Sequence, residues 1–84
     1  MPEKVKVGKV EHYYDKIGVA AVVLEDEVAI GDMLVFKQGS SENEQKVTSM
    51  QINHINVEKG FKGDSVGIKV DAPVDEGSDV YKEL

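Results

Sequence analysis

Hydrophobic and polar residues alternate along most of the chain with the period of two that is typical of β-strands. The first segment, 4–14, follows this alternation, but its phase changes after Gly8, which indicates a bulge or a sharp bend. Residues 17–24 are apolar or small on both faces and predict the most buried strand. Further strands are predicted at 33–37, 46–57, 65–70 and 79–82.

Polar and glycine-containing stretches separate these segments, and no stretch predicts a helix. Residues 38–45 have no periodicity and predict a polar loop, while 58–64 and 72–78 predict a turn and a second loop. The strand at 46–57 is expected to bend near His54. Six short strands with glycine–aspartate punctuation predict an all-β fold, specifically a small closed six-stranded antiparallel β-barrel forming a single domain over residues 1–84. Closure would remove the exposed edges of an open sheet.

The charged residues limit the partners that the chain is expected to bind. Sixteen carboxylates against ten lysines give a net charge of −6, and the chain has no arginine. Because arginine is the residue suited to bidentate phosphate and guanine recognition, RNA binding is possible but disfavoured. No apolar run reaches the roughly 20 residues of a membrane helix, and the N-terminus has no export signal. The expected location is therefore cytoplasmic, with no membrane partner.

Candidate catalytic chemistry is sparse. With no cysteine, a disulfide framework, a thiolate nucleophile and a cysteine zinc site are excluded. The serines lie outside any G-x-S-x-G elbow, and only His12 and His54 could act as bases near neutral pH. A metal site using both histidines and Asp15 is conceivable, but solvated strand-end histidines are the favoured interpretation. We therefore predict no enzyme activity, no metal and no cofactor.

An aromatic and polar group offers the more interesting candidate surface. Tyr13 and Tyr14 point in opposite directions on a strand, so we expect Tyr14 in the core and Tyr13 at the barrel rim. Lys16 and His54 are candidate polar members of this rim. Phe61 lies in a predicted turn, where it could either fold back as a plug for the barrel or contact a partner.

The order of the punctuating residues resembles that of a known family. They are Gly8-Lys9-Val10, Gly18, Ile30-Gly31-Asp32, Val47-Thr48-Ser49-Met50, Gly63-Asp64-Ser65-Val66-Gly67-Ile68 and Gly77-Ser78-Asp79-Val80. This pattern resembles the second domain of translation GTPases such as elongation factor Tu, a closed six-stranded β-barrel. It also resembles short free-standing elongation-factor-like proteins and a similar barrel at the C-terminus of some collagenase-like peptidases.

The resemblance implies a binding role rather than a nucleotide-dependent one. No G-x-x-x-x-G-K-[ST] motif is present, so GTP binding is excluded. Gln51 and Ser65 match the positions that hold the aminoacyl end of tRNA in elongation factor Tu, although neither is the family's residue. The candidate binding surface is therefore Tyr13, Lys16, Gln51, His54, Phe61 and Ser65.

Three functional hypotheses follow. The leading one is a non-catalytic β-barrel binding module, similar to the translation-factor domain, that acts through a protein or ribonucleoprotein partner. The second is direct binding of an RNA end, such as that of tRNA, through the aromatic and polar rim. The third is an accessory domain that acts in trans with a peptidase or another enzyme.

Overall fold

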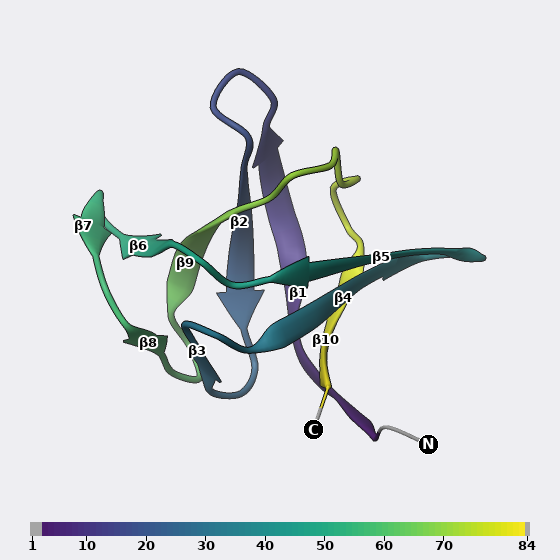
Figure 1. The fold of residues 1–84 in the computed structure, drawn as a ribbon, viewed down its shortest axis with the longest axis horizontal. Helices are drawn as coiled ribbons and strands as arrows, with labels where there is room; N and C mark the ends of the chain where they lie inside the picture. Colours follow the sequence, from purple (N-terminus) through teal and green to yellow (C-terminus); the bar gives the residue numbers. More distant parts are fainter. Residues whose placement is uncertain (1–2, 84) are drawn as a thin grey trace.

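A computed structural model describes residues 3–83 of the chain. In this range the chain folds into ten β-strands (Figure 1). They are β1 (Lys4–Tyr14), β2 (Val19–Leu24), β3 (Val28–Ala29), β4 (Met33–Gln38), β5 (Ser41–Lys46), β6 (Met50–Ile52), β7 (Ile55–Asn56), β8 (Lys59–Gly60), β9 (Ser65–Lys69) and β10 (Asp79–Glu83). The predicted all-β class is therefore confirmed. Within residues 3–83, no helix has the length and apolar character needed to cross a bilayer.

Eight of these strands form one antiparallel sheet, and the other two form a small separate ribbon. The order in the large sheet is β5-β4-β10-β1-β2-β9-β6-β7, while β3 pairs with β8. The first and last strands, β1 and β10, are neighbours, and their pairing runs from Lys4 opposite Glu83 to Lys9 opposite Asp79. In the described part of the chain β5 and β7 each pair on one side only, so the prediction of a closed six-stranded barrel is wrong.

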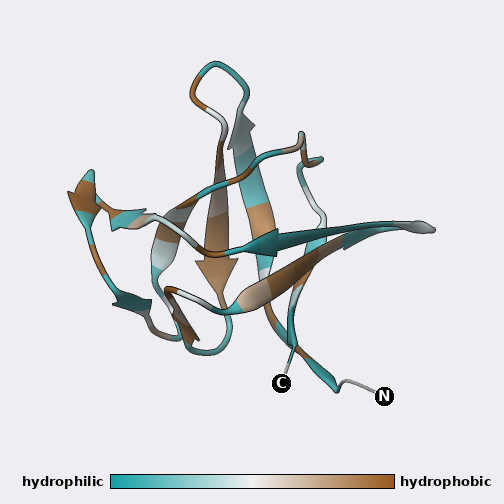
Figure 2. Cartoon of the chain, viewed as in Figure 1, coloured by the Kyte–Doolittle hydropathy of each residue, from teal (hydrophilic) through white to brown (hydrophobic). Residues whose placement is uncertain are grey.

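The strand β5 lies where the sequence predicts a loop. Its residues Ser41–Lys46 pair along their whole length with β4, from Gln38 opposite Ser41 to Met33 opposite Lys46. Figure 2 shows β5 as hydrophilic along its length, and most of its side chains are exposed. A hairpin fixes this pairing through backbone hydrogen bonds, so a strand exposed on both faces needs no alternating apolar residues. Its charged side chains also suit an edge strand.

The predicted long strand at 46–57 is instead a short hairpin. The strands β6 and β7 are joined by two residues with positive φ angles, Asn53 at 52° and His54 at 65°. Two residues with positive φ make a tight turn whose twist matches the strands, a geometry that favours glycine. The expected bend near His54 is therefore a full reversal. The stretch after it, predicted as a turn, contributes β8 to the ribbon with β3.

Two irregularities in β1 decide which of its side chains face the core. One lies between Lys6 and Gly8 against β10, as the sequence predicts, and a second lies between Val10 and His12 against β2. At Gly8, β1 and β2 approach each other closely. A Cβ at this position would lie 2.5 Å from the backbone oxygen of Val23 in β2. After the second irregularity, the side chains that would have faced the core face outward, and those that would have faced outward face the core.

As a consequence, the predicted orientation of the two tyrosines is wrong. Tyr13 is partly buried and packs against the core, whereas Tyr14 is 48% exposed. The sequence marks the first irregularity with a glycine, but no glycine or proline marks the second one.

The core lies inside the curl of the large sheet and is mainly aliphatic. Its members are Val7, Val10, Ala20, Val22, Leu24, Val28, Leu34, Phe36, Val47, Met50, Val66, Ile68, Val70, Val74 and Val80. Alternate residues of β2 and β9 supply its centre, and β4 contributes Leu34 and Phe36. The ion pair between Lys59 and Glu27, at 2.6 Å, joins β8 to the segment that leads into β3.

Candidate functional site

The outer face of β2 and its neighbours is unusually apolar for a surface. Within β2, Ala20, Val22 and Leu24 point into the core, while Val19, Ala21 and Val23 point outward. Val23 is 39% exposed, although β2 is paired on both sides. A surface-facing strand in an antiparallel sheet usually carries polar residues on its solvent side. This face is therefore the place to look for a binding site.

A hollow of about 340 Å³ lies on this face, and we call it the β2 groove. It is lined by Tyr14, Ile17, Val19, Ala21, Gln51, Asn53, His54, Ser65, Val66 and Gly67. These residues come from the end of β1, the β1–β2 turn, β2, β9 and the β6–β7 hairpin. Its volume lies at the small end of the range for ligand sites, roughly 300–1,000 Å³.

Small residues form the floor of the β2 groove. Ala21 pairs with Gly67, and Gly67 pairs with Gln51, so the three lie in one row across the strands. Gly67 has no positive φ. A Cβ at this position would project to within 3.2 Å of Val19 Cγ1. Its lack of a side chain leaves the backbone accessible, as often occurs where another chain or a ligand approaches a strand.

Two large exposed side chains flank this floor. Tyr14 packs its ring edge-on against His12, with the ring centroids 4.3 Å apart. His12 in turn contacts the carboxylate of Glu76 through Nδ1. Tyr14 therefore has an aromatic neighbour on its own strand, two residues away. Ile17, in the β1–β2 turn, is 65% exposed.

Neutral polar groups occupy the opposite rim. Gln51 donates from Nε2 to Oδ1 of Asn56 at 3.0 Å, which holds its carboxamide in place. The Ser65 hydroxyl donates to Oε2 of Glu11 at 3.3 Å. His54 lies in the tight β6–β7 turn. Hydroxyl and amide groups can both donate and accept hydrogen bonds, so this rim suits a ligand with a peptide-like set of polar atoms.

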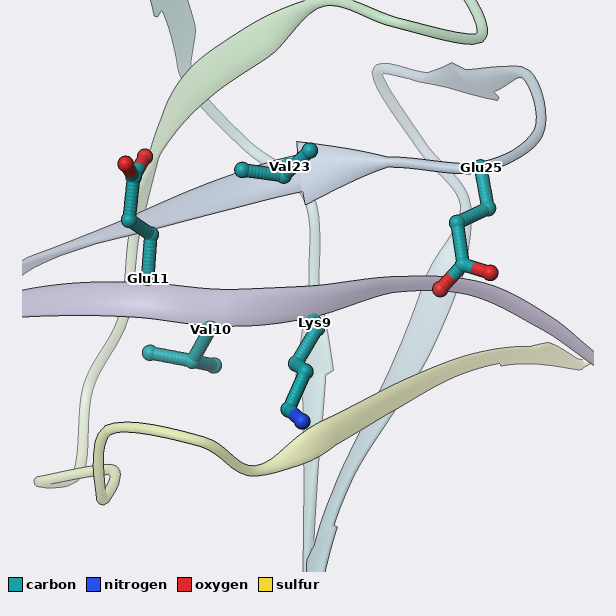
Figure 3. Close-up of a pocket in the computed structure, with 5 residues that line it drawn as sticks. All are labelled: Lys9, Val10, Glu11, Val23 and Glu25. Atoms are coloured by element: carbon teal, nitrogen blue, oxygen red, sulfur yellow. The ribbon is translucent and has the colours of Figure 1, made fainter.

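A second hollow of about 350 Å³ lies on the same strands, lined by Lys9, Val10, Glu11, Val23 and Glu25. Figure 3 shows Glu11 and Glu25 on either side of Val23, with Lys9 extending from β1 toward β10. Glu25 is 3.7 Å from Lys6, so part of its charge is already balanced. The hydrogen bond from Ser65 to Glu11 joins this hollow to the β2 groove.

The structure brings together three of the six predicted surface residues. Gln51, His54 and Ser65 all line the β2 groove. Tyr13 instead packs against the core, and Lys16 lies in the β1–β2 turn outside the lining. Phe61 is 56% exposed and also lies outside the groove, so it does not plug the core. Its backbone N–H donates to the Asp64 carboxylate at 2.9 Å.

Sequence reasoning missed Tyr14 and Ile17 as members of the groove. Ile17 was missed because the sequence placed it at the start of the strand over 17–24, whereas the structure has it in the turn between two strands. Tyr14 was missed because its orientation depends on the second irregularity in β1.

The shifted pKa values lie away from the groove. A hydrogen bond and the charge of Asp79 raise the pKa of Lys6, and the same two effects from Glu27 raise the pKa of Lys59. Although Ser65 and His54 share the groove, the Ser65 hydroxyl is directed to Glu11. In residues 3–83 no group of three or more histidine, aspartate or glutamate side chains is arranged to hold a metal ion.

The chain is similar in sequence to one segment of a larger protein. No family model matches the chain. A Methanocaldococcus jannaschii protein described as an uncharacterized protease is 40% identical over 79 residues, which cover 93% of this chain. The chain spans only 19% of the length of that relative.

Two solved structures show the same fold. The C-terminal domain of a Geobacillus thermoleovorans protein named as a U32 peptidase superimposes with a TM-score of 0.86 at 20% identity, over 94% of this chain and 92% of that one. The chain shares the fold of this domain. The selenomethionine variant of the same domain gives a TM-score of 0.85 at 18% identity, over 90% and 96% of the two chains.

These findings overturn the resemblance to the second domain of translation GTPases. The glycines that carried it, including Gly31, Gly63 and Gly77, have positive φ angles of 96°, 92° and 86°. They therefore meet the needs of tight turns, which recur in unrelated antiparallel folds. The description of the chain as translation-factor-like is wrong, and the match of Gln51 and Ser65 to the positions that hold the aminoacyl end of tRNA carries no functional meaning here.

Proposed function

We propose that the chain is a non-catalytic accessory domain that works together with a peptidase of the U32 type. The observation that carries this proposal is the sequence similarity to the M. jannaschii protein described as an uncharacterized protease. Nearly the whole chain is 40% identical to a segment that makes up 19% of that protein. The fold shared with a U32 peptidase C-terminal domain supports it. The proposed activity is binding, through a protein partner, rather than hydrolysis by the chain itself.

The sparse catalytic chemistry of the chain also supports a binding role. The groove contains one histidine and one serine, but the Ser65 hydroxyl donates to Glu11 and so is not activated by His54. A serine hydroxyl that is hydrogen-bonded to a carboxylate rather than to an imidazole is a weak nucleophile near neutral pH. An exposed apolar surface with a polar rim, by contrast, is typical of an interaction site.

Binding to the M. jannaschii relative tests this proposal. Calorimetric titrations would use the intact relative and a form that lacks the matched 79-residue segment, whose folding is first checked by circular dichroism. We expect the chain to bind the deleted form and to leave the intact form unbound, because the intact protein carries its own copy of the segment.

Hydrolysis assays with the chain alone provide a second readout. We expect no cleavage of casein, gelatin or fluorogenic peptides by the purified chain. Turnover that co-purifies with the chain at constant specific activity, or that Ser65→Ala or His54→Ala abolishes, would contradict a purely accessory role. Failure to bind a correctly folded deleted relative would contradict the association with the peptidase.

A further inference from the structure

We propose that the β2 groove binds an extended peptide segment that carries an aliphatic side chain next to a carboxylate. The inference rests on the proposed function for the origin of this segment, which would be a substrate of the peptidase. The groove itself carries the chemistry of the proposal, and that chemistry has three parts.

The first part is the apolar surface. Val19, Ala21 and Gly67 form an accessible floor beneath the exposed side chains of Tyr14 and Ile17. This surface lies on strands whose inner faces already supply the centre of the core, so the fold does not use it for its own packing. A hollow of about 340 Å³ has room for one aliphatic side chain and a short stretch of backbone, but not for a drug-sized ligand buried on all sides.

The second part is the neutral polar rim. Gln51, Asn53 and Ser65 offer amide and hydroxyl groups, and His54 offers an imidazole. Such groups match the N–H and C=O groups of a peptide backbone, which must keep hydrogen-bond partners when they leave water. A nucleic acid fits poorly, since the chain has no arginine and a net charge of −6.

The third part is the charge at one end of the groove. Lys69 pairs with Val19, so its side chain lies on the groove side of the sheet, and Lys16 directly precedes Ile17. Among the described residues, neither lysine has a carboxylate within ion-pair distance, although Asp15 shares the turn with Lys16. Each of these lysine side chains is therefore available to pair with a carboxylate on a ligand at this end of the groove.

Two backbone positions in the groove have a local conformational cost. Gly67 lies in the middle of a paired strand, where glycine has a high conformational-entropy cost, although a Cβ there would lie 3.2 Å from Val19 Cγ1. His54 occupies a positive-φ position that glycine would fill at lower cost. Stability is often given up in this way at functional sites.

The test is a titration of the full chain, labelled with ¹⁵N, followed through its backbone amide signals. The probe is the capped hexapeptide Ala-Ser-Leu-Asp-Ser-Ala. One comparison peptide has alanine in place of leucine, and another has lysine in place of aspartate. We expect shifts concentrated at Val19, Ala21, His54 and Gly67, and affinity about tenfold weaker for each comparison peptide.

Charge reversal supplies the matched variants. Lys16→Glu combined with Lys69→Glu should weaken the aspartate peptide about tenfold and should favour the lysine peptide. The control is Lys37→Glu combined with Lys46→Glu, which makes the same change in net charge on the β4–β5 hairpin, outside the groove. It should leave both affinities within about twofold of the original.

Several results would overturn the inference. They are the absence of groove shifts at millimolar peptide, equal binding of the alanine peptide, or shifts that grow with protein concentration alone. The last result would show that a second copy of the chain covers the groove. Shifts in the groove with a short CCA-ended RNA but not with the peptide would assign it to nucleic acid. Because the titration contains no peptidase, its failure is separate from failure of the proposed association.

Discussion

The two faces of β2 are built from similar residues but differ in what covers them. Val22 on the inner face is fully buried, whereas its neighbour Val23 on the outer face is 39% exposed. The inner face is explained by folding, because burying an aliphatic side chain removes it from water and contributes about 1.5–3 kcal/mol. The outer face receives only part of that stabilisation, so its apolar character calls for another explanation. Comparing the two faces separates residues that hold the fold from residues available for binding.

Truncation of a side chain on the inner face should have the largest effect. Leu24→Ala removes a buried side chain that lies against the closely packed Gly60, and we expect a loss of about 2–5 kcal/mol in the free energy of unfolding. Urea denaturation followed by circular dichroism measures it. Val23→Ala, the outer-face control, should cost less than about 1 kcal/mol. Equal losses would show that the outer face is also part of the core.

The β6–β7 turn should respond in the opposite direction. His54→Gly relieves a positive φ of 65°, and we expect the free energy of unfolding to rise by about 1 kcal/mol. Differential scanning calorimetry detects the accompanying increase in Tm. Ile55→Gly places glycine at the next position, within β7, and should lower Tm instead. If both variants lower Tm, the histidine side chain itself stabilises the hairpin.

The hydrogen bond that joins the two hollows should contribute little to folding. Ser65→Ala removes the contact with Glu11 at 3.3 Å, and because both groups are exposed we expect a change within about 0.5 kcal/mol. Chemical denaturation sets this value. Ser78→Ala is the contrasting variant, since Ser78 is buried and donates to the backbone oxygen of Asp75 at 2.6 Å. If Ser65→Ala lowered the free energy of unfolding more than Ser78→Ala does, Ser65 would be a structural residue rather than part of the binding surface.

The ion pair of Lys59 should produce the smallest effect, visible only through its pH dependence. Glu27 raises the pKa of Lys59 above its ordinary value of 10.5. The stabilisation is therefore fully present below that value and is lost as the pH rises through the higher folded-state pKa. The difference in Tm between the original chain and Lys59→Met should be small near neutral pH and should vanish in strongly alkaline buffer. A difference that persists there would show that the aliphatic stem, and not the charge, is responsible.

The sequence correctly predicted the strands whose apolar side chains are buried in the core. The segments for β1, β2, β4, β9 and β10 agree with prediction to within a few residues, because each of them lines the core. The strand β5 was missed because its pairing depends on the hairpin register rather than on apolar residues. Closure failed as a prediction because, within residues 3–83, the two outermost strands β5 and β7 each pair with a strand on one side only.

Prediction of the groove was limited by side-chain direction. Gln51, His54 and Ser65 come together because β6 pairs with β9 and the following turn brings His54 back over them. Tyr13 and Tyr14 point in the directions opposite to those predicted, because of an irregularity in β1 that no glycine marks. Its position depends on how β1 is held between β2 and β10, which is a tertiary constraint that local sequence does not encode.

The pairing of β1 with β10 has a consequence for protein engineering. Because Lys4 lies opposite Glu83, the polypeptide enters and leaves the folded unit at almost the same point. A unit with adjacent ends can be grafted into a surface loop of a host protein without stretching the host. It also suits circular permutation, with new ends opened in the Gly39-Ser40 turn at the tip of the β4–β5 hairpin. A permuted chain of this kind would carry fluorescent labels at the hairpin tip and leave the β2 groove free to report on binding.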